Sequence, residues 1–253
     1  MRHPPATVAE AAAKISELTG ITRKPTQVRH FLKRLGMAPR KVAAIPAKAD
    51  VDAQEQFKTG TLEPKLAAAQ RGQRAVYFVD AAHFVLAPFL GIVWCFARLF
   101  LKAPAGRQRF NVLGALHAIT KQVVTVTNDS YITAVEVCQL LDQLAALHPG
   151  LPISVVLDNA RYQRCALVQE HARRLQIELL FLPSYSPNLN LIERFWKYVK
   201  KECLYSKYYP AFAEFKQAIS TCIAQARLKH QAKLESLLAL RFQVFHPDAV
   251  HAA

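Results

Sequence analysis

One short apolar run, Ile153–Leu157, constrains the fold of this chain more than any other feature. It is too short for a helix, and it reads as a strand buried on both faces. A helical pattern follows over Ala166–Leu175, and a second strand is predicted over Ile177–Leu182. Strands separated by a helix usually lie parallel in one sheet. This stretch therefore predicts an α/β fold.

The preceding stretch has a different pattern. Strands are predicted over Ala75–Phe84, Gly91–Arg98 and Val112–Thr127, with two or more of them forming antiparallel hairpins. Amphipathic helices are predicted over Thr133–Leu147 and Leu189–Glu202. Antiparallel strands followed by alternating helices and strands predict a mixed sheet covered by helices, spanning residues 75–205.

The first 48 residues predict a small helical domain. Apolar residues at helical spacing, with Gly20 and Gly36 as stop signals, indicate two short helices. Between Ile21 and Lys41 the sequence has seven Lys or Arg and no acid. A cationic second helix after a tight connection is typical of a helix-turn-helix, although a helical packing module with a basic surface has the same pattern. Residues 49–74 are predicted to be a linker containing a helix or two, and residues 206–253 a C-terminal helical extension.

Net charge and cysteine content favour a protein that binds a polyanion and argue against a disulfide-rich or zinc-binding one. The formal net charge of +15 and the 52% apolar content predict a folded protein with a polyanionic partner, most simply double-stranded DNA. The five cysteines have no CxxC spacing, so neither a zinc site nor a disulfide framework is expected. The uncharged segment Phe84–Ala97 is too short to cross a bilayer and is interpreted as two strands joined by a turn. We expect no membrane, no small-molecule substrate and a cytoplasmic location.

Three acids lie on or directly beside apolar predicted elements, where charged residues are uncommon. Asp80 interrupts an otherwise apolar strand, Asp158 directly follows Leu157, and Glu193 lies on a predicted helix beside its packing face. Carboxylates that converge at a sheet edge repel one another unless cations hold them. Two Mg²⁺ (or Mn²⁺) ions bound to such oxygen ligands can promote phosphoryl transfer.

Each acid also has a purely structural explanation. Asp80 could cap a turn, Asp158 could begin an Asx-turn with Asn159, and Glu193 could pair with Lys197 one helical turn later. The three acids together, on the expected elements and in this order, favour the catalytic interpretation.

The motifs around these acids resemble those of a known family. The segments Val156–Ala160 and Leu182–Trp196 are similar to the second and third catalytic motifs of mariner-type DDE transposases and their bacterial insertion-sequence relatives. Thirty-four residues separate Asp158 from Glu193, a spacing typical of that branch. Val79–Phe84 resembles the strand that bears the family's first acid. The similarity extends over about residues 5–205.

The resemblance implies a ribonuclease H-like catalytic domain in which Asp80, Asp158 and Glu193 bind two metal ions. The implied reaction is cleavage at transposon ends followed by joining to target DNA by a homo-oligomer, in a bacterial cytoplasm and associated with the nucleoid when bound. Asn159 and Asn190 match motif positions next to the acids and are expected to support the metal ligands. Leu191 departs from the family, because many relatives have proline there, and we expect the helix to have begun before it.

Several basic side chains are expected to contact DNA. They comprise cations of the N-terminal helices and cations near the acids, namely Arg23, Lys24, Arg29, Lys33, Arg34, Arg161, Arg194 and Lys197. Trp196, on the apolar face of its helix, is expected in the core. The late lysines that lie away from Glu193 are expected to form a solvated helix surface.

The N-terminal region departs most from the family. Relatives usually carry paired helix-turn-helix units, whereas one fits before residue 50 here, so a truncated or split product is an open interpretation. The leading hypothesis is an insertion-sequence transposase. The alternatives are a DNA-binding remnant that no longer cuts and a ribonuclease H-type nuclease that hydrolyses without joining.

Overall fold

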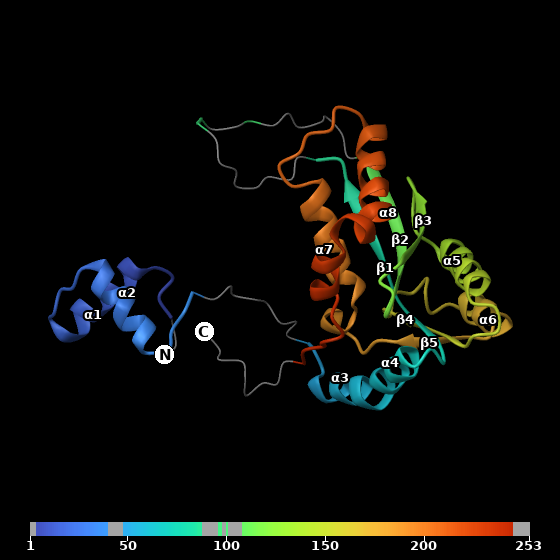
Figure 1. Ribbon diagram of the computed structural model, residues 1–253, viewed down its shortest axis with the longest axis horizontal. Coiled ribbons are helices and arrows are strands. Elements are labelled where there is room, and N and C mark those ends of the chain that lie inside the picture. Colours follow the sequence, from blue (N-terminus) through green and yellow to red (C-terminus); the bar gives the residue numbers. More distant parts are fainter. Residues whose placement is uncertain (1–3, 40–47, 88–95, 98–99, 101–107, 245–253) are drawn as a thin grey trace. The chain divides into compact units, whose positions relative to one another are not determined.

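The computed structural model describes residues 4–39, 48–87, 96–97, 100 and 108–244. The chain divides into two compact units, residues 48–244 and residues 1–47 with 245–253, and each is described by itself (Figure 1). Within the described ranges, no helix combines the length and apolarity that a membrane crossing requires.

The N-terminal unit contains the two predicted helices. Helix α1 (Val8–Thr19) is capped by the Thr7 hydroxyl, which accepts a hydrogen bond from the backbone N–H of Glu10 at 3.1 Å. It ends at Gly20, whose left-handed backbone (φ 69°) suits a residue without a Cβ. Helix α2 (Pro25–Arg34) begins with the predicted proline and ends in basic residues.

The second unit is built on a five-stranded mixed sheet. Its strands are β1 (Ala75–Val85), β2 (Arg109–His117), β3 (Val123–Asn128), β4 (Ile153–Leu157) and β5 (Ile177–Phe181). Their order is β3-β2-β1-β4-β5. Strands β1, β2 and β3 pair antiparallel, whereas β1–β4 and β4–β5 are parallel. The predicted mixed sheet is confirmed.

Two of the predicted strands need comment. The single range Val112–Thr127 is a hairpin of two strands, because the chain turns between His117 and Gln122 with Lys121 in the left-handed region (φ 59°). The His117 N–H donates to the Gln122 carbonyl at 2.8 Å and closes this turn. The predicted strand Gly91–Arg98 lies outside the described residues, apart from positions 96 and 97.

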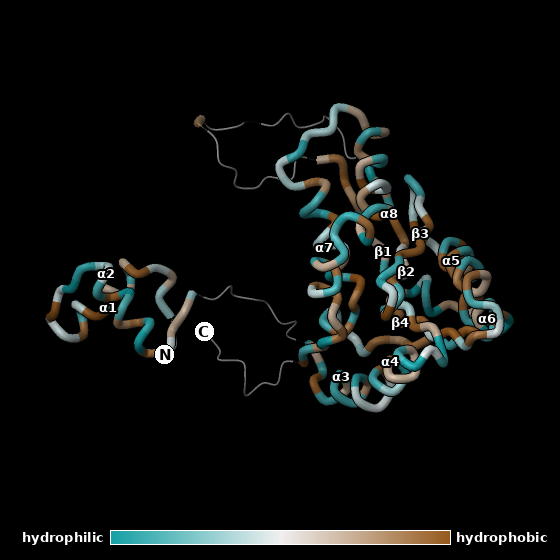
Figure 2. The backbone as a smooth tube through the Cα atoms, viewed as in Figure 1, coloured by the Kyte–Doolittle hydropathy of each residue, from teal (hydrophilic) through white to brown (hydrophobic). Residues whose placement is uncertain are grey.

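Helices cover both faces of the sheet, as Figure 1 shows, and the apolar strands lie between them in Figure 2. Helices α5 (Ala134–Leu147) and α6 (Ala166–Arg174) cover one face. The other face is covered by α7 (Ile192–Cys203) and α8 (Phe212–Leu237). Because successive side chains of a strand alternate, Tyr77 and Val79 face the first pair, whereas Val76 and Phe78 face the second.

The segment predicted as a linker is helical and belongs to the second unit. It forms α3 (Val51–Phe57), a π-helical turn η1 (Lys58–Leu62) and α4 (Glu63–Gln70). Leu62, Leu66 and Ala69 are buried in the same core cluster as α7. Burial of these side chains fixes the segment against the sheet.

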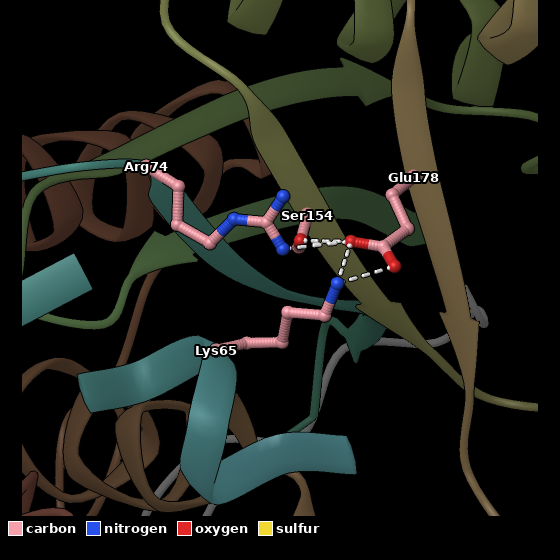
Figure 3. A network of polar contacts seen from close by, with 4 residues as sticks. All are labelled: Lys65, Arg74, Ser154 and Glu178. Atoms are coloured by element: carbon pink, nitrogen blue, oxygen red, sulfur yellow. Dashed lines mark hydrogen bonds and ion pairs between the residues drawn. The ribbon is translucent and has the colours of Figure 1, made fainter. Parts of the chain in front are cut away.

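A polar network attaches α4 and the start of β1 to the parallel strands (Figure 3). The Glu178 carboxylate on β5 accepts hydrogen bonds from Lys65 Nζ at 2.6 and 2.8 Å. Arg74 Nη1 and the Ser154 hydroxyl also donate to it, at 2.8 and 2.7 Å. Three donors from separate parts of the chain therefore meet on one carboxylate.

Candidate active site

Asp80 on β1 and Asp158, directly after β4, lie side by side at the edge of the sheet. Strands β1 and β4 are paired in parallel up to Phe78 and Val156, and continuing this register by two residues places Asp80 next to Asp158. Neighbouring strands are about 4.8 Å apart. Asp158 directly follows the last residue of β4, at the carboxyl edge where open sheets place ligands.

Glu193 lies on a helix of the layer that covers the sheet, not on a strand. A loop and the 3₁₀ turn η2 (Pro187–Leu189) lead into α7, and Glu193 lies in its first turn. The helix begins at Ile192, with Leu191 as its N-cap, so the prediction that it had begun before Leu191 was wrong. The predicted packing face is buried, comprising Ile192, Phe195, Trp196 and Val199.

The acids influence one another's charge. Burial, followed by the charges of Glu193 and Asp158, raises the pKa of Asp80 from 3.8 to about 7. Burial also raises the pKa of Asp158. Burial and the charges of Asp80 and Asp158 raise the pKa of Tyr162 to about 12. The charges of both other acids thus raise the pKa of Asp80, and the charges of both aspartates raise the pKa of Tyr162.

The donor set fits a hard divalent cation. Carboxylate oxygens that raise the pKa of a neighbouring carboxyl are stabilised when a cation replaces the proton. In the part of the chain that the structure describes, no three His, Cys, Asp or Glu side chains are grouped tightly enough to hold one ion as they stand. Binding of an ion by all three acids would therefore require side-chain adjustment.

Asn190 connects the two strands that carry the aspartates. Its Nδ2 donates to the Val79 carbonyl at 3.1 Å and to Asp158 Oδ1 at 3.4 Å. Its buried Oδ1 accepts no hydrogen bond within the described residues. Asn159 has a different position: its Nδ2 donates to the Leu182 carbonyl, and its Oδ1 accepts from Arg164 Nη1 at 2.9 Å. Asn190 thus contacts an acid directly, whereas Asn159 joins the ends of β4 and β5.

Two residues shape the site in ways that the sequence did not predict. Gly114 pairs with Asp80 across β1 and β2, and the Trp196 indole fills the space that a side chain at position 114 would need. The buried Trp196 Nε1–H has no hydrogen-bond partner in the described ranges. It lies beside Asp80 and lowers the pKa of that carboxyl without reaching hydrogen-bond geometry. A glycine inside a strand was the one available signal.

The predicted DNA contacts separate into three groups. Those in the N-terminal unit are all exposed: Arg23, Lys24, Arg29, Lys33 and Arg34. Arg161 and Lys197 are exposed in the second unit. Arg194 is half-buried and donates hydrogen bonds to the carbonyls of Ala239 and Arg241. Two of its donors are therefore engaged within the chain.

The mixed sheet, its helical layers and the acids at its carboxyl edge define a ribonuclease H-like protein. A family model described as DDE superfamily endonuclease matches residues 75–216, and one described as winged helix-turn helix matches residues 6–61. The chain belongs to the DDE superfamily endonucleases. No curated protein matches it significantly.

Solved structures of a mariner transposase share the fold. The Mos1 mariner paired-end complex with Mn is 14% identical with a TM-score of 0.60, covering 97% of this chain and 81% of that one. The Mos1 strand transfer complex is 15% identical with a TM-score of 0.58, covering 96% and 81% respectively. At these identities the likeness concerns the fold.

Proposed function

We propose that this chain is a DNA transposase of an insertion sequence that cuts element ends and joins them to target DNA. The observation that carries the proposal is the register of Asp80 beside Asp158, with Glu193 close enough to raise the pKa of Asp80. Membership of the DDE superfamily endonucleases and the helix-turn-helix match support the same activity. The Mos1 structures, which include complexes with Mn and with Mg, support a divalent metal.

In this proposal Asp80, Asp158 and Glu193 hold two Mg²⁺ or Mn²⁺ ions. When bound, the ions would activate the attacking water or 3′-hydroxyl and neutralise charge on the leaving oxygen. The protein's own groups orient the ligands. Asn190 holds the Asp158 carboxylate against β1, and the packed face of α7 fixes Glu193. Arg161 and Lys197, both exposed, are available to phosphates near the acids.

The N-terminal unit is proposed to bind double-stranded DNA. The exposed cations of α2 and of the residues before it suit phosphate contacts, and the second helix of a helix-turn-helix enters the major groove. A homo-oligomer would bring two ends together, in a bacterial cytoplasm. A binding remnant that no longer cuts remains the alternative outcome of the test below.

The test is divalent-metal-dependent cleavage of DNA that carries the gene with its native flanks. Wild type is compared with Glu193→Gln, and Glu202→Gln on the same helix is the matched control, because Glu202 pairs with Lys233 away from the acids. We expect wild type and the control to cut at the element boundaries, and Glu193→Gln to bind without cutting. Cutting by Glu193→Gln would overturn the catalytic assignment. Binding without cutting by wild type, in both Mg²⁺ and Mn²⁺, would favour the remnant.

A further inference from the structure

The C-terminal segment of the second unit, residues 238–244, packs against the core cluster that contains α7. We call this segment the C-terminal strap. It follows α8 and is drawn in red beside the start of α3 (Figure 1). Leu238 and Phe242 are buried, and Leu240 and Val244 pack partly buried against the same core cluster. The strap thus belongs to the fold of this unit.

The strap contacts the strand that carries the first acid. The Phe242 ring stacks on Phe78 with centroids 5.7 Å apart and an angle of 28° between the planes. Phe78 precedes Asp80 by two residues, so both side chains project from the same face of β1. This stacking therefore supports β1 directly before Asp80.

The strap is also tied to the residue after the third acid. Arg194 Nη1 donates to the Ala239 carbonyl at 3.0 Å, and Nη2 donates to the Arg241 carbonyl. The guanidinium lies over the Phe242 ring, 5.8 Å from its centroid. A planar fork with several donors suits two carbonyls at once, which a lysine ammonium cannot match in geometry. Arg194 therefore fixes the first turn of α7 to the strap.

A third attachment reaches the loop before α7. Asn188 Nδ2 donates to the Gln243 carbonyl and to Gln54 Oε1, both at 2.9 Å. Gln54 on α3 in turn donates to the Tyr185 carbonyl at 3.4 Å. The strap, α3 and the loop leading to Glu193 are thereby joined by polar contacts, of which the two made by Gln54 are half-buried and the one to Gln243 is exposed.

We propose that the C-terminal strap positions Glu193 relative to Asp80, with Arg194 as the positioning residue rather than a phosphate contact. The proposal rests on the proposed function, because it names what holds two of the three catalytic acids in place. The strap contacts Phe78, two residues before Asp80, and Arg194, the residue after Glu193. Its loss would leave the carboxylates present but not held in the arrangement that cutting needs.

The experiment compares four proteins: Arg194→Ala, Arg194→Lys, truncation after Leu238, and Arg194→Ala combined with that truncation. Truncation after Val244, which keeps the strap, is the matched control. Cleavage is measured as a function of Mg²⁺ concentration, and duplex binding as a function of salt. Hydrogen exchange of the first turn of α7, where the Arg194 N–H donates to the Leu191 carbonyl, provides a readout that needs no activity. Phe242→Ala is a milder substitute if the truncated chain does not fold.

We expect Arg194→Ala, Arg194→Lys and the truncation each to lower cutting by about tenfold or more and to speed exchange in the first turn of α7. The combined variant should be no worse than the truncation, because the truncation already removes the carbonyls of Ala239 and Arg241 to which Arg194 donates. Arg194→Ala should have the same salt dependence of binding as wild type. The truncation after Leu238 is compared with the truncation after Val244, which lacks the same residues 245–253 and should cut better because it keeps the strap. Retained cutting in Arg194→Lys with a weaker salt dependence in Arg194→Ala would overturn the proposal and make Arg194 a phosphate contact. If wild type does not cut at all, the proposed function fails. Unchanged exchange in Arg194→Ala would then overturn the strap as well.

Discussion

Asp80 and Gly114 lie opposite each other in the antiparallel pairing of β1 and β2, and the Trp196 indole of α7 rests on that glycine. A Cβ at position 114 would lie 2.6 Å from Trp196 Cζ2 and 3.0 Å from Ile192 Cδ1. The contact with the indole is far inside normal van der Waals separation, and the one with Ile192 is tighter than normal. The rigid indole cannot move away as a flexible side chain would. The absence of a side chain at 114 thus sets how closely the helix of Glu193 approaches the strand of Asp80.

Gly114→Ala is therefore expected to push α7 away from the sheet. Overpacking of this kind costs about 1–3 kcal/mol of unfolding free energy, and displacement of Glu193 should also reduce cutting. Urea unfolding and the cleavage assay measure the two effects. Gly60→Ala is the matched control, because a Cβ there meets nothing within 4 Å, and it should be neutral or stabilising by up to about 1 kcal/mol. Equal stability of Gly114→Ala and wild type would refute this account of the close approach.

The strands β1 and β4 and the positions of Asp80 and Asp158 on them were predictable because they depend on local pattern. An apolar run broken by one acid identified β1 and Asp80, and the run ending at Asp158 identified β4. The contact of Gly114 with Trp196 was not predictable, since it depends on how closely two distant elements pack. Arg194 shows the same limit: its sequence position suggested a phosphate contact, whereas its partners are carbonyls more than 40 residues later.

Residues 49–74 contain two α-helices, α3 and α4, in agreement with the predicted helix or two, but the π-helical turn Lys58–Leu62 between them was not predicted. This turn inserts an extra residue, which shifts the apolar positions of α4 relative to those of α3. Helix α7 was predicted to begin at Leu189, where apolar spacing starts, yet the chain forms a 3₁₀ turn there and the helix begins at Ile192. Apolar spacing alone does not distinguish these two conformations.

Asp80→Asn should stabilise the metal-free protein at neutral pH. Burial, Glu193 and Asp158 raise the pKa of Asp80 in the folded state to about 7, above its ordinary 3.8. Its contribution to stability is therefore fully present below pH 3.8 and is lost as the pH rises through 7. This rise in the pKa of Asp80 corresponds to at most about 4 kcal/mol of unfolding free energy. Thermal melting at pH 8 should show a higher Tm for Asp80→Asn than for wild type without metal.

The same variant should lose the stabilising effect of metal. Addition of Mg²⁺ or Mn²⁺ should raise the Tm of wild type, because ligands that bind only the folded state stabilise it, and should leave that of Asp80→Asn nearly unchanged. Asp52→Asn is the control, since Asp52 is exposed and its loss should change stability by less than about 0.5 kcal/mol. A metal-free Asp80→Asn less stable than wild type at pH 8 would contradict the predicted repulsion.

His117 should make the fold sensitive to acid. Its Nδ1 accepts hydrogen bonds from the N–H groups of Ile119 and Thr120, both at 3.1 Å, so this nitrogen must be unprotonated. Burial, followed by the charges of His148 and Lys121, lowers the pKa of His117 to about 4. Its contribution is therefore present above pH 6.5 and is lost as the pH falls towards 4. The loss between pH 6.5 and 5 amounts to about 2 kcal/mol.

Because Asp80 changes stability in the opposite direction over this range, the His117 effect is measured in the Asp80→Asn background. Chemical unfolding at pH 7 and pH 5 is compared with and without His117→Asn, which keeps a polar acceptor. We expect the parent to lose more stability on acidification than the double variant. An identical loss in both would show that His117 does not carry the effect.

Glu178→Gln should weaken the attachment of α4 and the start of β1 to the sheet. The carboxylate is paired with Lys65 and Arg74, but its side chain is 39% exposed, so solvent screening limits the expected cost to about 1 kcal/mol. The cost should shrink in high salt, because the interaction is ionic. Urea unfolding at low and high salt measures it. Glu170→Gln is the control: its pair with Arg173 is exposed on both sides, and its loss should have no measurable effect.

Arg29→Ala and Lys33→Ala should weaken duplex binding through the loss of phosphate contacts. The two residues are one helical turn apart on α2 and are both exposed, whereas Val28 on the same helix is buried. Each phosphate contact releases about 0.9 counterion, so each substitution should flatten the plot of log affinity against log salt by about one unit. The double variant should flatten it by about two units. Glu193→Gln should leave the slope unchanged, because Glu193 is a carboxylate and contacts no phosphate. An unchanged slope in the double variant would mean that α2 does not lie against the DNA backbone.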